Sequence, residues 1–139
     1  MSPRGCTFCA IVAGELPAAR VLEDDLCVGF LDARPLFHGH VLLVPRTHVE
    51  TLPDLRGTDV GPFFERAQRL SVAVRDAMDA VGTFVAINNV VSQSVPHLHV
   101  HVVPRRPKDG LRGFFWPRTK YADEAERDAV AARIRAELA

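Results

Sequence analysis

The stretch HLHVHVV at residues 97–103 places three histidines at alternate positions, with aliphatic residues in the other places. In an extended strand, alternate side chains lie on one face, and each step of two residues advances roughly 6.6–6.8 Å. The stretch therefore predicts a strand bounded by Pro96 and Pro104. Its three imidazoles would lie on one face, and its apolar face would pack in the core.

Four other short apolar runs predict strands. They lie at 20–23, 26–31, 40–45 and 83–88. The first two runs are separated by Asp24 and Asp25, which predicts a hairpin. Pro45 is expected to end the third strand.

Apolar residues spaced three and four apart predict an amphipathic helix over 58–81. Thr58 or Asp59 is the expected N-terminal cap, Pro62 suits the first turn, and Gly82 suits the C-terminal stop.

A last helix is expected from Asp123 to about Leu138, with Glu126 placed as a capping box requires. The order of strands, helix, strands and helix predicts an α+β fold with two helices against a five-stranded, mainly antiparallel sheet. The length suits one domain over 1–139.

The composition excludes several classes of protein. Apolar residues make up 47% of the 139 residues, enough for a core. Lys+Arg and Asp+Glu are both 17, which argues against a long nucleic-acid track. No stretch approaches the ~20 apolar residues that span a bilayer, and no signal-peptide run is present, so we expect a cytoplasmic protein that does not engage membranes. Three cysteines are too few for a disulfide scaffold and indicate thiols or metal ligands.

The row of histidines suits nucleophilic and acid–base catalysis, because imidazole titrates near pH ~6.5. A metal cradle is a second interpretation, although the three positions lie too far apart along a flat strand to reach one ion easily. Polar residues just before the strand, among them Ser92, Gln93 and Ser94, offer donors suited to a phosphate oxyanion. The combination predicts attack at phosphorus.

These residues resemble the histidine triad (HIT) superfamily of nucleotide hydrolases and transferases. The 97–103 stretch matches the family's His-φ-His-φ-His-φ-φ pattern, where φ is apolar. Further blocks, in the expected order, lie at 6–17, 30–32, 39–48 and 93–97. The resemblance covers most of the chain and implies a HIT-like fold that dimerises into a ten-stranded sheet.

The resemblance implies hydrolysis or transfer at the α-phosphorus of a purine nucleotide, with no organic cofactor. By position, His99 would be the nucleophile and form a covalent nucleotidyl-imidazole intermediate. His101 would contact the phosphate and help the leaving group depart, and His40 would support the arrangement.

The resemblance also implies a nucleotide pocket. Asp32 would bind the ribose hydroxyls. The apolar base pocket would comprise Phe8, Ile11 and Phe30, and the phosphate contacts would be Asn88, Gln93 and Ser94. The loop at 88–93 departs from the family, since it is shorter than Asn-x-Gly…Ala-Gly-Gln and lacks both glycines. Asn88 and Asn89 are therefore both candidates for the strand-end contact.

Cys6 and Cys9 form a Cys-x-x-Cys pair, which suits a zinc half-site, a redox pair or two small residues. No thioredoxin-like βαβ pattern surrounds the pair. The resemblance implies structural zinc held by this pair with His48 and His97, a closed Cys2His2 set. His97 would then be a ligand. Cys27 alternates with apolar neighbours and is expected in the core.

Three consecutive aromatics, Phe114, Phe115 and Trp116, predict a partner surface. The alternative is that Phe114 and Trp116 pack on their own chain. The resemblance supplies a second copy as the partner, so we expect a two-fold homodimer with Trp116 at or near the interface. The segment 105–139 would pack near the active site and that interface.

The function expected from these residues is hydrolysis of dinucleoside polyphosphates or AMP conjugates. Two alternatives remain: a nucleoside phosphoramidase, or a nucleotide-binding interaction protein whose catalysis is incidental.

Overall fold

The computed structural model describes residues 4–111 and 118–139. The chain forms two compact units, Met1–Asp109 and Gly110–Ala139. Within the described residues, the first unit contains α1 (Thr7–Val12), β1 (Arg20–Glu23), β2 (Cys27–Leu31), β3 (Val41–Pro45), the 3₁₀ turn η1 (Leu52–Asp54), α2 (Gly57–Ala77), β4 (Gly82–Ala86) and β5 (Val100–Arg105). The second contains α3 (Glu124–Leu138). No described helix is both long and apolar enough to cross a bilayer.

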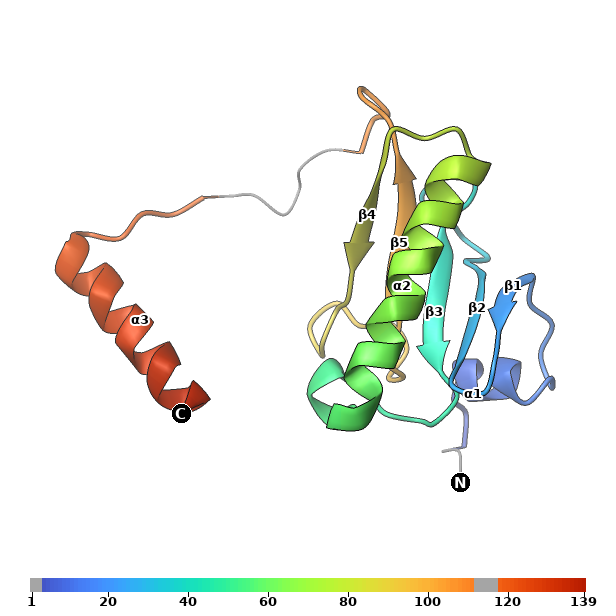
Figure 1. Ribbon diagram of the computed structural model, residues 1–139, viewed down its shortest axis with the longest axis horizontal. Helices are drawn as coiled ribbons and strands as arrows, with labels where there is room; N and C mark the ends of the chain where they lie inside the picture. The colour runs from blue at the N-terminus through green and yellow to red at the C-terminus, as the bar shows by residue number, and fades with distance from the viewer. Residues whose placement is uncertain (1–3, 112–117) are drawn as a thin grey trace. The chain divides into compact units, whose positions relative to one another are not determined.

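The five strands form one sheet in the order β1-β2-β3-β5-β4, and every neighbouring pair is antiparallel (Figure 1). This confirms the predicted five-stranded sheet. The β1–β2 hairpin turns where expected, because the Asp24 carboxylate accepts the backbone N–H groups of Leu26 and Cys27, both at 2.9 Å.

The predicted bounds of the histidine strand are wrong at both ends. β5 begins at Val100 and continues through Pro104 to Arg105. Pro104 is tolerated because β3 pairs with β5 only as far as Val102, which leaves one side of the strand without a partner in the sheet. At the other end, the Leu98 N–H donates to the Val49 carbonyl at 2.7 Å, outside the sheet ladder.

The long helix α2 also differs at both ends from the predicted range 58–81. Its N-cap is Arg56, so Thr58 and Asp59 lie inside the first turn. Pro62, predicted for the first turn, lies inside the helix. At the C-terminal end, Asp79 adopts the left-handed backbone with φ 50°, a role predicted for Gly82. Gly82 instead begins β4.

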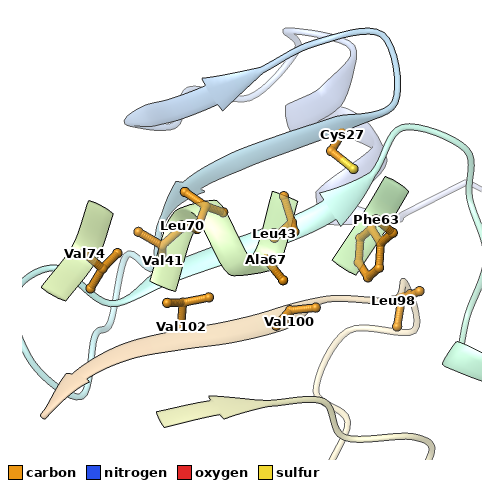
Figure 2. Close-up of a cluster of buried hydrophobic side chains, with 10 residues drawn as sticks. All are labelled: Cys27, Val41, Leu43, Phe63, Ala67, Leu70, Val74, Leu98, Val100 and Val102. Carbon is orange, nitrogen blue, oxygen red and sulfur yellow. The ribbon is translucent and has the colours of Figure 1, made fainter. Parts of the chain in front are cut away.

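The helix α2 covers one face of the sheet, and the main core lies between them (Figure 1). Figure 2 shows its buried side chains directed toward those of the strands. The cluster consists of Phe63, Ala67, Leu70 and Val74 from α2 with Cys27, Val41, Leu43, Leu98, Val100 and Val102. Cys27 is fully buried here, as predicted, and burial raises its pKa to about 12.

The short helix α1 packs against the opposite face and is absent from the sequence-based prediction. Cys6 is its N-cap, and the Cys6 Sγ accepts the Cys9 N–H at 3.3 Å. A second buried cluster joins α1 to the sheet through Cys6, Phe8, Cys9, Ile11, Val28, Phe30, Leu42 and Val44. Because strand side chains alternate, Leu42 and its partner His101 share this face.

The helix α3 begins as predicted, since the Asp123 carboxylate accepts the Glu126 N–H at 2.8 Å. The Glu126 side chain reaches back one residue further than a capping box requires, to the Ala122 N–H at 3.1 Å. Trp116, the predicted interface residue, lies outside the described residues, as do Phe114 and Phe115. The placement of 105–139 near the active site stays a prediction.

Candidate functional site

Two thiols and two imidazoles converge beside α1. The sulfurs of Cys6 and Cys9 and one ring nitrogen each of His48 and His97 all lie within 4.8 Å of one another. The His97 Nδ1 is 3.4 Å from both sulfurs and 3.2 Å from the His48 Nδ1. Zinc bonds of ~2.3 Å to sulfur and ~2.0–2.1 Å to nitrogen would separate tetrahedral ligands by roughly 3.3–3.8 Å. The spacing therefore fits one zinc ion.

The backbone fixes which nitrogen of the His97 ring carries the lone pair. Its Nε2 lies 2.9 Å from the carbonyl oxygen of Pro45, which only accepts, so Nε2 carries the proton. The Nδ1 lone pair then faces the thiols. Burial lowers the pKa of His97 to about 4, although the bond to Pro45 works in the other direction, so the ring is neutral near pH 7. A neutral imidazole with an anchored second nitrogen is what a metal site requires.

His99 is oriented by a carbonyl oxygen in the same way. Its Nδ1 lies 2.7 Å from the carbonyl oxygen of His97, so Nδ1 carries the proton and Nε2 carries the lone pair. The ring is 3% exposed and packs edge-to-face with Phe8, at 5.0 Å between centroids. This arrangement leaves the lone pair on Nε2 of a ring that cannot easily turn.

His40 and His101 form a directed chain of hydrogen bonds. The Leu36 N–H donates to the His40 Nδ1 at 3.1 Å, so the neutral His40 ring carries its proton on Nε2. That proton is shared with the His101 Nδ1 at 3.0 Å. The His101 proton is consequently on Nε2, and His101 can donate it to a bound group.

Both rings of this chain stay neutral near pH 7. Burial lowers the pKa of His101 to about 4, and the neighbouring His99 and His40 act in the same direction. Burial also lowers the pKa of His40, against an opposing effect of Asp32, whose Oδ2 lies 3.7 Å from the His40 Nε2. Although Asp32, His40 and His101 are close enough to hold an ion, the His40 Nε2 has no lone pair to offer. The group is a hydrogen-bond chain.

A cavity of about 560 Å³ opens beside His99 and His101. Five of the predicted nucleotide-binding residues line it: Phe8, Ile11, Phe30, Asp32 and Ser94. Pro17, Ala18, Ala19, Leu42 and Val95 extend the apolar wall, and the sequence-based prediction missed them. Pro17, Ala18, Ala19 and Val95 lie outside helices and strands and carry no periodic signal, whereas Leu42 lies in β3 on the face of His101.

Asp32 is held in place at the cavity by its own turn. Its Oδ1 accepts the Arg34 N–H at 2.9 Å. Arg34, Ala33 and Thr7 also line the cavity, and the prediction did not include them among the site residues. An acidic side chain and an apolar wall thus stand at one cavity with two histidines, which suits a ligand with both polar and apolar parts.

The loop at 88–93 is tied to the segment around η1. The Gln93 side chain donates to the Glu50 carbonyl at 2.6 Å and accepts the Val90 N–H at 2.9 Å, and the Asn89 side chain accepts the Leu52 N–H at 2.8 Å. Neither Gln93 nor Asn88 lines the cavity. Their roles at a phosphate stay predictions.

This loop keeps a left-handed backbone although it lacks the family's two glycines. Val90 has φ 69° and Ser92 has φ 62°. A β-branched residue rarely adopts this conformation, so the hydrogen bond from the Val90 N–H to Gln93 helps to hold a strained turn.

Comparison with known proteins identifies the family. Residues 13–108 match the HIT domain. The chain belongs to the HIT domain family. It is 34% identical to "Protein hit" of Bacillus subtilis over 80% of this chain and 78% of that protein. It is 34% identical to an adenylylsulfatase of Arabidopsis thaliana over 76% of this chain and 55% of that protein. An adenosine 5′-monophosphoramidase of Candida albicans is 30% identical over 84% of this chain and 80% of that protein.

Solved structures share the HIT fold. A HIT family protein from Bacillus subtilis superposes with a TM-score of 0.86 at 31% identity, covering 98% of this chain and 99% of that chain. A zinc-bound histidine triad family protein from Mycobacterium smegmatis has a TM-score of 0.73 at 38% identity, covering 96% and 97%. The family includes hydrolases and at least one zinc-bound member.

Proposed function

We propose that this HIT protein hydrolyses purine nucleotide conjugates at the α-phosphorus through a nucleotidyl-His99 intermediate. The observation that carries the proposal is the 2.7 Å bond between the His99 Nδ1 and the His97 carbonyl oxygen, because it leaves the lone pair on Nε2 in a ring that lines the cavity. The neighbouring His101, with its proton on Nε2, supplies a donor beside that nucleophile.

The chemistry proceeds in two displacements. The His99 Nε2 forms a bond to the α-phosphorus as the bond from phosphorus to the leaving group breaks. The phosphorylated ring carries a positive charge, and the His97 carbonyl stabilises its Nδ1–H. His101 donates a hydrogen bond to the phosphate or to the departing atom. Water then attacks phosphorus as the bond from phosphorus to the His99 Nε2 breaks. The water gives a proton to the solvent, the nucleoside monophosphate leaves, and His99 returns to its neutral form.

Other residues that line the cavity would bind the ribose and the base of the nucleotide. The Asp32 carboxylate can accept hydrogen bonds from both ribose hydroxyls. Phe8, Ile11 and Phe30 form an apolar wall suited to a purine. Ser94 also lines the cavity and would contact the phosphate.

Cys6, Cys9, His48 and His97 would hold structural zinc. Their spacing and the single His97 tautomer support this proposal. When bound, the metal would stabilise the fold locally and take no part in the displacement.

The leaving group defines a second candidate within this class. Two relatives are named adenylylsulfatase and adenosine 5′-monophosphoramidase. The substrates that these names describe both contain an adenosine 5′-phosphoryl group joined to a small leaving group. These names favour AMP conjugates with a small leaving group, a phosphoramidate included, over dinucleoside polyphosphates.

The test is AMP release from adenosine 5′-phosphoramidate, adenylyl sulfate and diadenosine polyphosphates. We expect turnover on the first two, trapping of a nucleotidyl group on His99, and loss of turnover with retained AMP binding in His99→Ala. His38→Ala removes an exposed histidine outside the cavity and is the matched control. Near-normal turnover in His99→Ala would refute the mechanism. AMP binding without turnover in the wild type would favour an interaction protein.

The proposal includes a two-fold homodimer. An edge strand such as β4 has one side open to pairing in this sheet. Light scattering should give twice the chain mass of 15.3 kDa. A mass of one chain at micromolar concentration would refute the dimer, and an unchanged dimer in Trp116→Ala would exclude an essential role for Trp116 at the interface.

A further inference from the structure

We infer that the group of Cys6, Cys9, His48 and His97 positions the nucleotide pocket, so that zinc and AMP each raise the protein's affinity for the other. The inference rests on the proposed function of the cavity and of the metal group. It goes further by assigning the metal group an energetic coupling to the nucleotide, in addition to stabilising the fold.

The first connection between the metal group and the cavity is the segment formed by α1 and its N-cap, which contributes residues to both. Cys6 and Cys9 belong to the metal group, whereas Phe8 and Ile11 line the cavity. The helix has six residues, and a helix this short is not stable without tertiary contacts. Its position therefore depends on how firmly its two thiols and its apolar side chains are held.

Phe8 transmits the position of α1 to the pocket. Its ring lies 5.0 Å from His99, 5.5 Å from Phe30 and 6.1 Å from His97, in edge-to-face contacts between ring centroids. One aromatic ring therefore contacts a metal-group residue, the proposed nucleophile and a second aromatic residue of the cavity lining. A small shift of α1 would move all three contacts.

The second connection runs through the backbone of His97. Its ring belongs to the metal group, and its carbonyl oxygen holds the His99 Nδ1 proton at 2.7 Å. A metal bond to the Nδ1 of His97, together with the Nε2 bond to Pro45, would fasten the ring at both nitrogens. The carbonyl that selects the His99 tautomer would then be held more rigidly.

Coupling of this kind is reciprocal. If zinc raises the affinity for AMP by a given factor, AMP must raise the affinity for zinc by the same factor. Couplings between two sites commonly amount to roughly 5–150-fold, and we expect about ten-fold here. If the metal group were not coupled to the pocket, zinc would not change the affinity for AMP, and AMP would not change the affinity for zinc.

The main experiment measures AMP affinity by calorimetry on the full chain, with zinc bound and after removal by a chelator. We expect AMP to bind about ten-fold more weakly without zinc. The reverse measurement follows transfer of zinc from the loaded protein to a chromogenic chelator, which does not require a stable zinc-free protein. Saturating AMP should slow this transfer several-fold. Equal AMP affinity with and without zinc, or an AMP-independent transfer rate, would overturn the inference.

Variants separate coupling from a general loss of stability. Cys6→Ser weakens the metal group, whereas Cys27→Ser alters a buried thiol in the core on the α2 side of the sheet. Only Cys6→Ser should weaken AMP binding and change the ¹⁵N shifts of the His99 ring. Equal effects in both variants would reduce the role of the metal group to stability and refute positioning. Absence of AMP binding to the zinc-loaded wild type would instead contradict the proposed function.

Discussion

Two groups of histidines, built from neighbouring strands and loops on one side of the sheet, have opposite hydrogen-bonding characters. In the metal group, the lone pair of the His97 Nδ1 faces two sulfurs, and the His48 Nδ1 lies 3.2 Å from the Cys9 Sγ. In the relay group, defined as His40 and His101, His40 accepts the Leu36 N–H at Nδ1 and donates from Nε2 to the His101 Nδ1. Both groups consist of buried or half-buried imidazoles, so residue type and burial do not distinguish them.

The difference arises from the backbone atom that contacts each ring. His97 meets a carbonyl oxygen, that of Pro45, which requires a proton on Nε2 and leaves Nδ1 as a ligand. His40 meets an N–H, that of Leu36, which requires a lone pair on Nδ1 and leaves Nε2 as a donor. A histidine near other histidines is therefore a ligand or a proton donor according to one backbone contact.

The largest expected effect is on zinc. Cys9→Ala removes one of the four ligands, so the metal content should fall from about one zinc per chain to nearly none. The affinity of the wild type should also fall at acid pH as the thiolates protonate. Elemental analysis measures the content, with Cys27→Ala as the control that should keep its zinc. Full occupancy in Cys9→Ala would show that the group is not the metal site.

The relay group should affect turnover without affecting zinc. His101→Ala removes the donor beside the proposed nucleophile and should lower kcat by about 10²–10⁴-fold. Steady-state kinetics and elemental analysis on the same preparation provide the check. A variant that loses zinc and activity together would contradict the separation of the two groups.

His40 should matter less, because it acts through His101. His40→Leu leaves the His101 Nδ1 without its donor, and we expect kcat to fall roughly ten-fold with little change in KM. His40→Gln keeps both a donor and an acceptor, and it should recover part of the activity. Equal losses in the two variants would indicate that His40 fills space and does not orient His101.

Gly39 holds the backbone just before His40. It has φ 93°, and a Cβ at this position would lie 2.5 Å from the Met78 Cγ. Gly39→Ala should therefore lower the free energy of unfolding by about 1–3 kcal/mol. Denaturant titration measures the loss, and Met78→Ala in the same chain should relieve the contact but not the backbone strain. Complete rescue by Met78→Ala would show that φ contributes nothing.

The smallest expected effect is on stability in acid. The pKa of His101 is about 4 in the folded protein against 6.5 for the free side chain, so the unfolded chain binds more protons between these values. The free energy of unfolding should therefore decrease as the pH falls from about 6.5 to about 4. The whole pKa difference corresponds to roughly 3 kcal/mol, and we expect about 1 kcal/mol because solvent screens the half-buried His101 ring. His101→Asn should flatten this part of the pH profile. A profile that stays equally steep would assign the effect to other groups.

Most of the helices and strands could be predicted from the sequence because their apolar residues are spaced periodically. The alternation at 97–103 correctly assigned Leu98, Val100 and Val102 to the core. Periodicity could not give the ends of α2, since its apolar spacing runs past Met78, where the left-handed Asp79 follows the helix. It could not give α1 either, because six residues complete fewer than two turns.

Only part of the candidate site could be predicted from the sequence. The sequence pattern and the family resemblance named Phe8, Ile11, Phe30, Asp32 and Ser94, which all line one cavity. They did not identify the bonds that direct the Gln93 side chain to Glu50 and Val90, because those bonds depend on how a short loop without glycine turns.

By itself, the sequence determined which side chains share a face, because alternation in a strand follows from backbone geometry. It thereby placed His99 and His101 together, opposite an apolar core. Only the tertiary structure decided what His97 and His101 can do. The proton of a neutral ring lies on whichever nitrogen faces an acceptor, and the groups that face His97 and His101 come from residues 52 and 61 positions away. No local pattern contains that information, since it arises when β3, β5 and the loop before β3 come together.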